Sequence, residues 1–269
     1  MSLVFESDII DALKARDDSS VDLVLLDPPY YEVVSDEWDN QWASLSDYLA
    51  WSSGWLQESV RVLKPGGSLM VFGYFPVLSR YMVFLPNLDY QDYIVWTFNR
   101  GGKGTQLHRR HEDILWMSKG SPKFHHLRGE RYYRTRVYAD EFAKYSPPYP
   151  DGLIHKANAH RGGTAGYDFH VEGAKLSNAW HIERILHQSK ERVEHPTQKP
   201  IELIDRMVRM TTDREDVVLD GFGGSGTTAL VCSRLRREYY VSDKDPAYVQ
   251  MAQSRIDTDE YGLLSMFAL

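Results

Sequence analysis

The stretch Asp216–Thr228, which reads DVVLDGFGGSGTT, joins a short apolar run to a glycine-rich turn. The apolar run predicts a buried strand, and a helical pattern follows the turn. Glycines at 221, 223 and 226 satisfy G-x-G-x-x-G. Because glycine has no side chain, such a turn lets a ligand approach backbone N–H groups at the helix N-terminus. The stretch predicts a nucleoside-binding loop, with a plain glycine-rich turn as the alternative; Asp220–Thr228 is called the glycine loop below.

Asp243 strengthens this interpretation. It lies twenty residues after Gly223, at the predicted end of the next strand, where a carboxylate can accept hydrogen bonds from ribose hydroxyls. A nicotinamide cofactor and S-adenosylmethionine both contain a ribose, so the loop alone does not choose between them.

Strands and helices alternate outward from this loop. We expect strands at 21–26, 68–73, 93–98, 113–117, 216–220 and 238–243, and helices at 45–63, 200–210, 226–236 and 246–256. This alternation implies an α/β fold with a largely parallel sheet covered on both faces. Residues 120–190 break the rhythm with Gly, Pro and His, which indicates an insertion.

A second motif, Asp27-Pro28-Pro29-Tyr30, directly follows the apolar run VDLVLL. At the carboxyl end of a parallel strand, residues project into the crevice where ligands bind. The prolines remove N–H donors and leave carbonyl acceptors beside a carboxylate and an aromatic ring. This set suits a planar amine: Asp27 and the Pro28 carbonyl would accept its two N–H bonds, and Tyr30 would stack on its ring. Asp27–Tyr30 is called the DPPY motif below.

Composition excludes several classes of protein. The 269 residues are 42% hydrophobic and 26% charged, which excludes wholesale disorder, and the longest nearly apolar run, 68–78, is too short to span a bilayer. The start MSLVFESD has no signal-peptide pattern. A single cysteine, Cys232, excludes an internal disulfide. We therefore expect a cytoplasmic protein without a membrane partner.

The net charge of −7 is an average over two unlike regions. Between Asn99 and Pro200 lie 18 of the 31 basic residues, 11 of the 38 acidic ones and all ten histidines, which leaves +7 there and −14 elsewhere. Aromatic residues are interleaved with the basic ones, as in RGERYYRTRVY at 128–138. Such a segment is typical of a phosphate-contacting surface, with a solvated polar surface as the alternative. The histidines lack metal-ligand spacing, so no metal site is expected.

These motifs together resemble a known family. The DPPY motif looks like the catalytic motif of amino-group (N6-adenine or N4-cytosine) DNA methyltransferases, and the glycine loop looks like their S-adenosylmethionine loop. His195–Pro200 matches the HPTQKP signature of the circularly permuted β class and is called the HPTQKP segment below. SDIIDAL with Asp8, RVLKPGG at 61–67 and HEDILWMSKG at 111–120 also fit. The order of the motifs along the chain is that of the β class.

The resemblance implies a Rossmann-like methyltransferase fold, circularly permuted, with a mostly parallel seven-stranded sheet. It divides the chain into a catalytic half at 1–119, a target-recognition insertion at 120–190 and a cofactor-binding half at 191–269. Two positions depart from the family pattern: Gly221 stands where proline is usual, and Asp243 where glutamate is common.

The resemblance also implies the chemistry. The catalytic residues would be Asp27, Pro28, Pro29 and Tyr30. S-adenosylmethionine would be bound by Asp8, Asp27, Thr197, Lys199, Asp220, Phe222, Gly223, Gly224, Ser225, Gly226, Thr227 and Asp243. For Asp8 a helix N-cap is the alternative role. The expected reaction is sequence-specific transfer of a methyl group to N6 of an adenine flipped out of duplex DNA.

Double-stranded DNA is the expected partner, and a homodimer and a cognate restriction enzyme are further candidates. The expected DNA contacts are Arg109, Arg110, His125, Arg128, Arg131, Arg134 and Arg136. Adenine is favoured over cytosine because Asp27 stands where cytosine-N4 enzymes of the family have serine. Ser146-Pro147-Pro148-Tyr149 resembles that serine motif, but no apolar strand precedes it. Cytosine-N4 transfer and a non-catalytic DNA-binding module are the alternative functions.

Substitution of Arg131, Arg134 and Arg136 by alanine should weaken DNA binding and flatten its salt dependence. Each lost phosphate contact should reduce the slope of log K against log salt concentration by about 0.9. Binding titrations at several salt concentrations measure this slope, and an unchanged slope would remove the segment from the DNA interface.

Overall fold

The computed structural model describes residues 2–31, 41–99, 108–130, 153–154, 169–170 and 174–259. The chain divides into two compact units. Unit 1 comprises Met1–His125 and Asn178–Leu269, and unit 2 comprises His126–Ser177. In unit 2 the described backbone forms two small antiparallel sheets, one pairing β6 (Arg128–Glu130) with β9 (Ala174–Lys175) and the other pairing β7 (Leu153–Ile154) with β8 (Phe169–His170).

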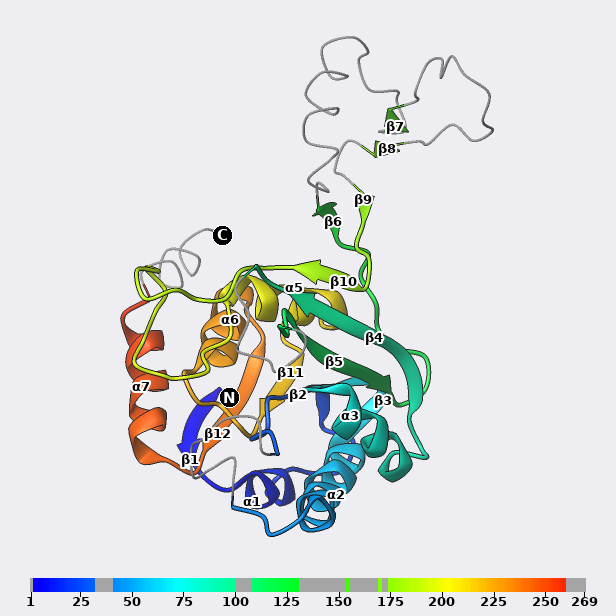
Figure 1. Cartoon of the computed structure of the whole chain (residues 1–269), viewed down its shortest axis with the longest axis vertical. Helices are drawn as coiled ribbons and strands as arrows, with labels where there is room; N and C mark the ends of the chain where they lie inside the picture. The colour runs from blue at the N-terminus through cyan, green and yellow to red at the C-terminus, as the bar shows by residue number, and fades with distance from the viewer. Residues whose placement is uncertain are drawn as a thin grey trace. The chain divides into compact units, whose positions relative to one another are not determined.

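Unit 1 is built around an eight-stranded mixed sheet, which confirms the expected α/β class (Figure 1). Its strands follow the order β1-β12-β11-β2-β3-β5-β4-β10. Their bounds are β1 Leu3–Glu6, β2 Val21–Leu26, β3 Leu63–Gly73, β4 Asp89–Thr97, β5 His111–Ser118, β10 Ala179–His181, β11 Val217–Asp220 and β12 Glu238–Asp243. Only β5 runs antiparallel to its two neighbours, β3 and β4; the other neighbouring pairs are parallel.

The sheet has one strand more than the seven expected. Two edge strands, β1 with four residues and β10 with three, have no counterpart among the strands named from the sequence. An edge strand needs backbone hydrogen bonds on one side only and can be very short. Sequences as brief as LVFE and AWH therefore carry no recognisable strand pattern, and the pairing partner decides their structure.

Helices cover both faces of the sheet. Helices α1 (Ile9–Lys14), α2 (Leu45–Val62) and α3 (Phe75–Tyr81) pack against one another, and α3 continues into the 3-10 turn η2 (Met82–Phe84). Helices α5 (Ile201–Thr211), α6 (Thr227–Leu235) and α7 (Pro246–Asp257) form the other layer (Figure 1). None of the helices among the described residues has the length and apolarity needed to cross a membrane.

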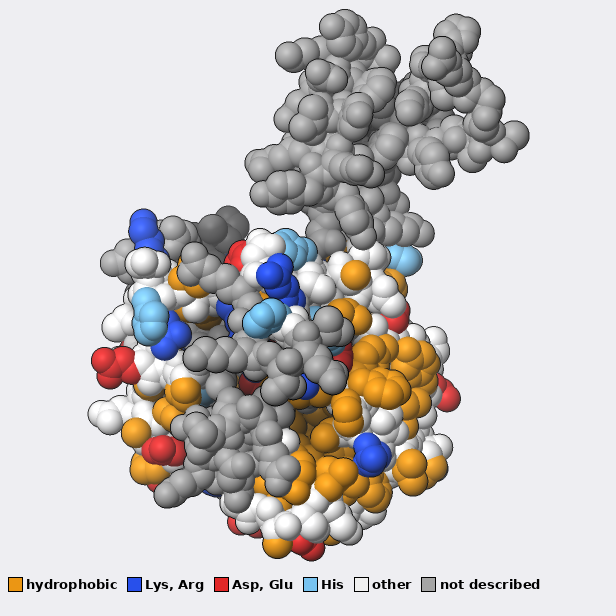
Figure 2. All heavy atoms as spheres, viewed as in Figure 1, with side chains coloured by type: hydrophobic (Ala, Val, Ile, Leu, Met, Phe, Trp, Pro, Cys, Tyr) orange, Lys and Arg blue, Asp and Glu red, His pale blue; other side chains and the backbone are white. Residues whose placement is uncertain are grey.

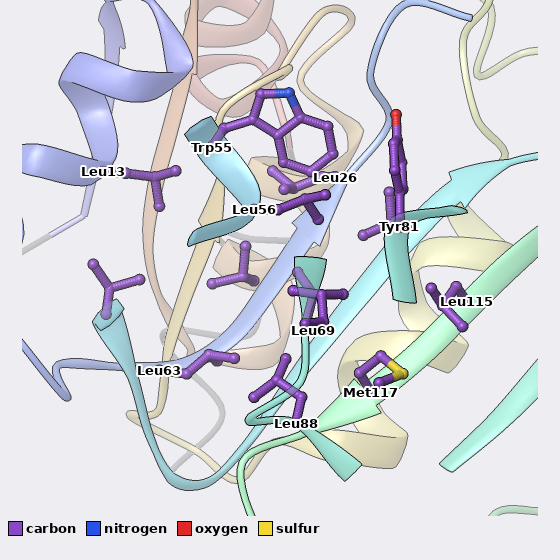
Figure 3. Close-up of a cluster of buried hydrophobic side chains, with 14 of the residues drawn as sticks. Leu13, Leu26, Trp55, Leu56, Leu63, Leu69, Tyr81, Leu88, Leu115 and Met117 are labelled. Atoms are coloured by element: carbon purple, nitrogen blue, oxygen red, sulfur yellow. The ribbon is translucent and has the colours of Figure 1, made fainter. Parts of the chain in front are cut away.

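The main core lies between α2 and the central strands (Figure 3). Trp55 and Leu56 of α2 are fully buried against Leu26 of β2 and Leu69 of β3. Strand β2 lies between β11 and β3 in the middle of the sheet, which explains its nearly continuous apolar sequence. The strand that precedes the DPPY motif is therefore among the most firmly held parts of the fold.

The face drawn in Figure 2 carries an apolar patch. Hydrophobic side chains gather over α3 and β4 on the face drawn in Figure 2. The exposed large hydrophobic residues of these elements are Phe75 of α3, Met82 and Val83 of η2, and Tyr90 of β4.

Gly226, at the N-terminus of α6, is required by both conformation and packing. It has φ +73°, and a Cβ there would lie 2.5 Å from the Cβ of Ala252 in α7. We expect Gly226→Ala to lower the free energy of unfolding by about 2–4 kcal/mol, from left-handed backbone strain and overpacking together. Denaturant unfolding measures the change.

Gly120→Ala is the matched control for this substitution. Gly120 has a similar φ of +79°, but nothing lies within 4 Å of an added Cβ, so only the conformational cost of about 1 kcal/mol applies. Equal destabilisation by the two substitutions would contradict the packing account.

Candidate functional site

The DPPY motif follows β2 at the edge of the sheet where several parallel strands end. Strands β1, β12, β11 and β2 are parallel, so their carboxyl ends and the loops that follow share this edge. The glycine loop follows β11, and Asp243 ends β12. Because β5 is antiparallel to β3, its first residues lie at the same edge, where Asp113 pairs with Gly73. The topology thus brings the DPPY motif, the glycine loop, Asp243 and the first residues of β5 to the same edge of the sheet.

Helix α2 holds the DPPY motif through hydrogen bonds of its buried hydroxyl groups. The hydroxyl of Tyr48 donates to the carbonyl oxygen of Pro29 at 2.9 Å. It also hydrogen bonds the hydroxyl of Tyr81 at 2.7 Å, and Ser52 Oγ lies 3.1 Å from that same Tyr81 oxygen. These hydroxyls are buried, so each needs its partner. The chain of hydroxyls fixes the backbone of the motif.

Asp27 is bound on both of its carboxylate oxygens. Lys199 of the HPTQKP segment donates from Nζ to Oδ2 at 2.6 Å. The hydroxyl of Tyr30 donates to Oδ1 at 2.9 Å. The structure therefore joins two motifs that lie 172 residues apart in the sequence.

Glu112, the second residue of β5, completes this cluster and was not among the residues predicted from the sequence. Its Oε2 accepts from the Tyr30 hydroxyl at 3.3 Å and lies 3.5 Å from Lys199 Nζ. Its Oε1 is paired with Arg184. The available signal was a charged residue at the start of an otherwise buried strand, within the HEDILWMSKG stretch.

Burial and charge oppose each other in this cluster. Burial alone would lower the pKa of Lys199, but the charges of Asp27 and Glu112 more than compensate and raise it, so its ammonium stays protonated. Burial and the charges of the same two carboxylates raise the pKa of Tyr30 well above its usual value. The Tyr30 hydroxyl is therefore a stable hydrogen-bond donor. Burial also raises the pKa of Asp27.

The glycine loop packs closely on β12 and on α2. A Cβ at Gly223 would lie 2.4 Å from Val241 Cγ1, and Gly223 N donates to Ser242 O at 2.8 Å. The Phe222 ring packs on Trp51 and Trp55 of α2, with ring centroids 6.0 and 5.9 Å apart. These contacts fix the loop backbone, with Gly223 packed against β12 and Phe222 against α2.

Three acidic residues predicted to bind a cofactor brace the backbone around this loop. Asp243 Oδ2 accepts from Gly224 N and Oδ1 from Asp245 N, each at 2.9 Å. Asp220 accepts from Phe222 N at 3.0 Å and from Thr228 Oγ1 at 2.6 Å. Asp8 accepts from Ile10 N at 2.8 Å as the N-cap of α1, which is the alternative role considered for it.

The HPTQKP segment lies against the glycine loop. The His195 ring covers Gly224, where an added Cβ would lie 2.7 Å from Nε2, and Thr227 Oγ1 donates to Lys199 O at 3.2 Å. Burial, reinforced by the charge of Lys199, lowers the pKa of His195 to about 4, so the ring is neutral. Thr197, in contrast, is exposed.

Two further residues hold this region and were not predicted. Gln198 braces its own segment, accepting from Val193 N at 2.9 Å and donating to Glu191 O at 2.7 Å. Arg255 of α7 donates to Ser225 O at 2.6 Å and so supports the glycine loop. Glutamine in HPTQKP was a visible signal, whereas nothing in the sequence near Arg255 indicated its role.

Among the predicted DNA contacts, two arginines lie exposed and a histidine is paired with an acidic residue. Arg109 and Arg110 are exposed, and the Arg109 guanidinium lies over the Tyr74 ring at 3.8 Å. The Tyr74 ring packs edge-on against Tyr30, with centroids 5.0 Å apart, so Arg109 lies near the DPPY motif. His125 instead pairs with Asp213, with Nε2 and Oδ1 2.9 Å apart.

The other predicted DNA contacts fall wholly or partly outside the described residues. The backbone of Arg128 begins β6, but its side chain is outside the described part. Arg131, Arg134, Arg136 and the Ser146–Tyr149 motif lie outside the described residues.

Asp220 should give stability a measurable pH dependence. Burial raises its pKa to about 7, against about 3.9 in an unfolded chain. Between about pH 4 and pH 7 Asp220 is therefore more protonated in the folded protein than in the unfolded chain. The free energy of unfolding should fall as pH rises through this range, by up to about 1.4 kcal/mol per pH unit. Asp220→Asn should flatten this dependence in denaturant unfolding at about pH 5 and pH 7. The same slope in wild type and variant would contradict the assignment.

Comparisons with known proteins identify the family. The family model described as DNA methylase, of the N6/N4 type, matches residues 21–254. The chain is 32% identical to the type II methyltransferase M.HpaI of Haemophilus parainfluenzae over 269 residues, covering 97% of this chain and 76% of that protein. It is 28% identical to the type II methyltransferase M.BglII of Bacillus subtilis, covering 94% and 68%.

Solved structures share the fold. The M1.HpyAVI complex with S-adenosylmethionine superposes with a TM-score of 0.62 at 19% identity, covering 96% of this chain and all of that one. The cytosine-N4-specific PvuII DNA methyltransferase gives a TM-score of 0.67 at 20% identity, covering 99% and 90%. With a family model that spans most of the sequence, the chain belongs to the N6/N4 DNA methylase family.

Proposed function

We propose that this chain transfers a methyl group from S-adenosylmethionine to N6 of an adenine in duplex DNA. The observation that carries the proposal is the contact between Lys199 and Asp27, which sets the DPPY motif beside the HPTQKP segment and the glycine loop. The amino group and the nucleoside cofactor would therefore meet at one edge of the sheet.

The glycine loop is the part of the site that we assign to a nucleoside cofactor. A side chain at Gly223 or Gly226 would fill space that β12 and α7 already occupy, so these glycines serve close packing, which holds the loop backbone in one conformation. Asp243 at the end of β12 is fixed by the amides of Gly224 and Asp245. The proposed cofactor residues are Asp8, Asp27, Thr197, Lys199, Asp220, Phe222, Gly223, Gly224, Ser225, Gly226, Thr227 and Asp243. S-adenosylmethionine supplies a methyl group made electrophilic by its positive sulfur.

The chain's own contribution is to prepare the amino group. The N6 lone pair of adenine is delocalised into the ring and is a poor nucleophile. Asp27 and the Pro28 carbonyl would accept hydrogen bonds from the two N6–H groups. These two bonds would favour a pyramidal nitrogen with its lone pair directed at the methyl carbon. Methyl transfer would form the nitrogen–carbon bond as the carbon–sulfur bond breaks with its electron pair left on sulfur, and one N6 proton would leave. We assign Asp27 as the acceptor of that proton.

Positioning and electrostatics would supply most of the rate enhancement. An adenine inside a duplex must be flipped out at a cost of a few kcal/mol. Stacking on Tyr30, worth about 1–3 kcal/mol, would offset part of this cost. Arg109, beside Tyr74, and Arg110 would contact the DNA near this site.

Cytosine-N4 transfer is the nearest alternative, because cytosine also offers a two-proton amino group. Asp27 in place of serine favours adenine, through a correlation within the family. A non-catalytic DNA-binding module would not need the buried pairing of Asp27 with Lys199. A cognate restriction enzyme is a further part of the proposal, suggested by the type II names of the relatives, and so is a homodimer.

Asp27→Ala should reduce methyl transfer to DNA by at least about 100-fold, because the amino group loses its anionic acceptor. S-adenosylmethionine affinity should change far less. Glu112, 3.5 Å from Lys199, leaves the ammonium a partner, so the variant should fold. Transfer of a labelled methyl group to DNA and calorimetric cofactor binding measure the two effects.

Asp205→Ala is the control, because it removes a carboxylate from an ion pair with Arg209 on α5, 2.8 Å long. It should leave both quantities unchanged. Asp27→Ala with turnover near that of wild type would exclude Asp27 from the reaction.

A further inference from the structure

Two hydrogen-bond donors in the site each face two carboxylates. Lys199 Nζ lies 2.6 Å from Asp27 Oδ2 and 3.5 Å from Glu112 Oε2. The Tyr30 hydroxyl lies 2.9 Å from Asp27 Oδ1 and 3.3 Å from the same Glu112 oxygen. Both donors therefore contact Asp27 more closely, with Glu112 as a second acceptor within reach.

This arrangement conflicts with the role proposed for Asp27. An amino group that donates to Asp27 shares a carboxylate oxygen with Lys199 or with Tyr30. A carboxylate that stays paired with an ammonium is a weaker base and a weaker acceptor for the amino group. Displacing a buried ammonium without a new partner is strongly unfavourable. A second acceptor beside Lys199 would therefore let Asp27 act at full strength when the target base enters.

We propose that Glu112 is a positioning residue that receives Lys199 and the Tyr30 hydroxyl when the amino group of the target base binds Asp27. This inference rests on the proposed function. The exchange needs little movement: Lys199 Nζ must approach Glu112 by about 0.7 Å to reach the usual length of a charge-assisted hydrogen bond, and Tyr30 is already within hydrogen-bond distance.

Glu112 is held in place for this role. Its side chain is only 7% exposed, and its other oxygen is paired with Arg184. The Arg184 guanidinium in turn lies over the Phe98 ring at 4.0 Å. Two carboxylates and two cations stay within the cluster before and after the exchange, so its net charge does not change.

Glu112→Gln tests the exchange, because the neutral amide has one acceptor oxygen in place of two and no negative charge to attract Lys199. Wild-type methylation of DNA first identifies the target site. Two duplexes are then compared without cofactor, one with adenine at the target and one with purine, which has hydrogen in place of the 6-amino group. Fluorescence anisotropy gives the dissociation constant of each.

The effect should depend on the amino group. Glu112→Gln should weaken binding of the adenine duplex about ten-fold relative to the purine duplex, the size of one charge-assisted hydrogen bond. The cost of flipping the base is the same in both proteins and cancels from the comparison. Asp113→Asn is the matched control: Asp113 is the next residue of β5 and equally buried, but it accepts from Tyr93 at 2.9 Å and does not contact the cluster. It should leave the ratio unchanged.

An adenine-to-purine ratio in Glu112→Gln equal to that of wild type would overturn the inference. Absence of any DNA methylation by the wild type would instead count against the proposed function. If Glu112→Gln does not fold, a crystal structure of the wild type on its target DNA decides. Lys199 Nζ should then lie within about 3 Å of Glu112 and away from Asp27; Lys199 still on Asp27 beside a bound amino group would overturn the exchange.

Discussion

The ion pair between Lys199 and Asp27 is the contact on which the arrangement of the site depends. It joins a loop that follows β2 to a segment that precedes α5, across 172 residues of sequence. An unpaired buried ion is strongly destabilising, so the pairing stabilises both charges. With Glu112 and Arg184 the two residues form a cluster with balanced charge.

Sheet topology explains how these residues meet. The carboxyl ends of β2, β11 and β12 lie at one edge, and the antiparallel strand β5 begins there. The glycine loop, packed on β12 and α2, and the DPPY motif, tied to Tyr48, come to that edge from different parts of the chain. This placement supports a reaction between two ligands held by separate loops, as the family of DNA methylases requires.

Sequence patterns predicted the central strands, helices α2, α5, α6 and α7 and the motifs at strand ends, because buried parallel strands and glycine turns have strong local signatures. The short helices α1 and α3 were not among the expected helices. Glu112 was missed because ligand-binding residues are expected at the carboxyl ends of parallel strands, and Glu112 reaches the site from the beginning of an antiparallel one. Arg184 and Arg255 were missed because their partners lie far away in sequence. The edge strands β1 and β10 were missed because they are too short to carry a pattern.

The proposal that one site holds a cofactor and the amino group of an adenine is tested most directly by the product. The protein is incubated with methyl-labelled S-adenosylmethionine and DNA of mixed sequence, and the DNA is digested to nucleosides. The account predicts that the label is found in N6-methyladenine. Label in N4-methylcytosine would contradict the choice of base, and unlabelled DNA would contradict the proposed reaction.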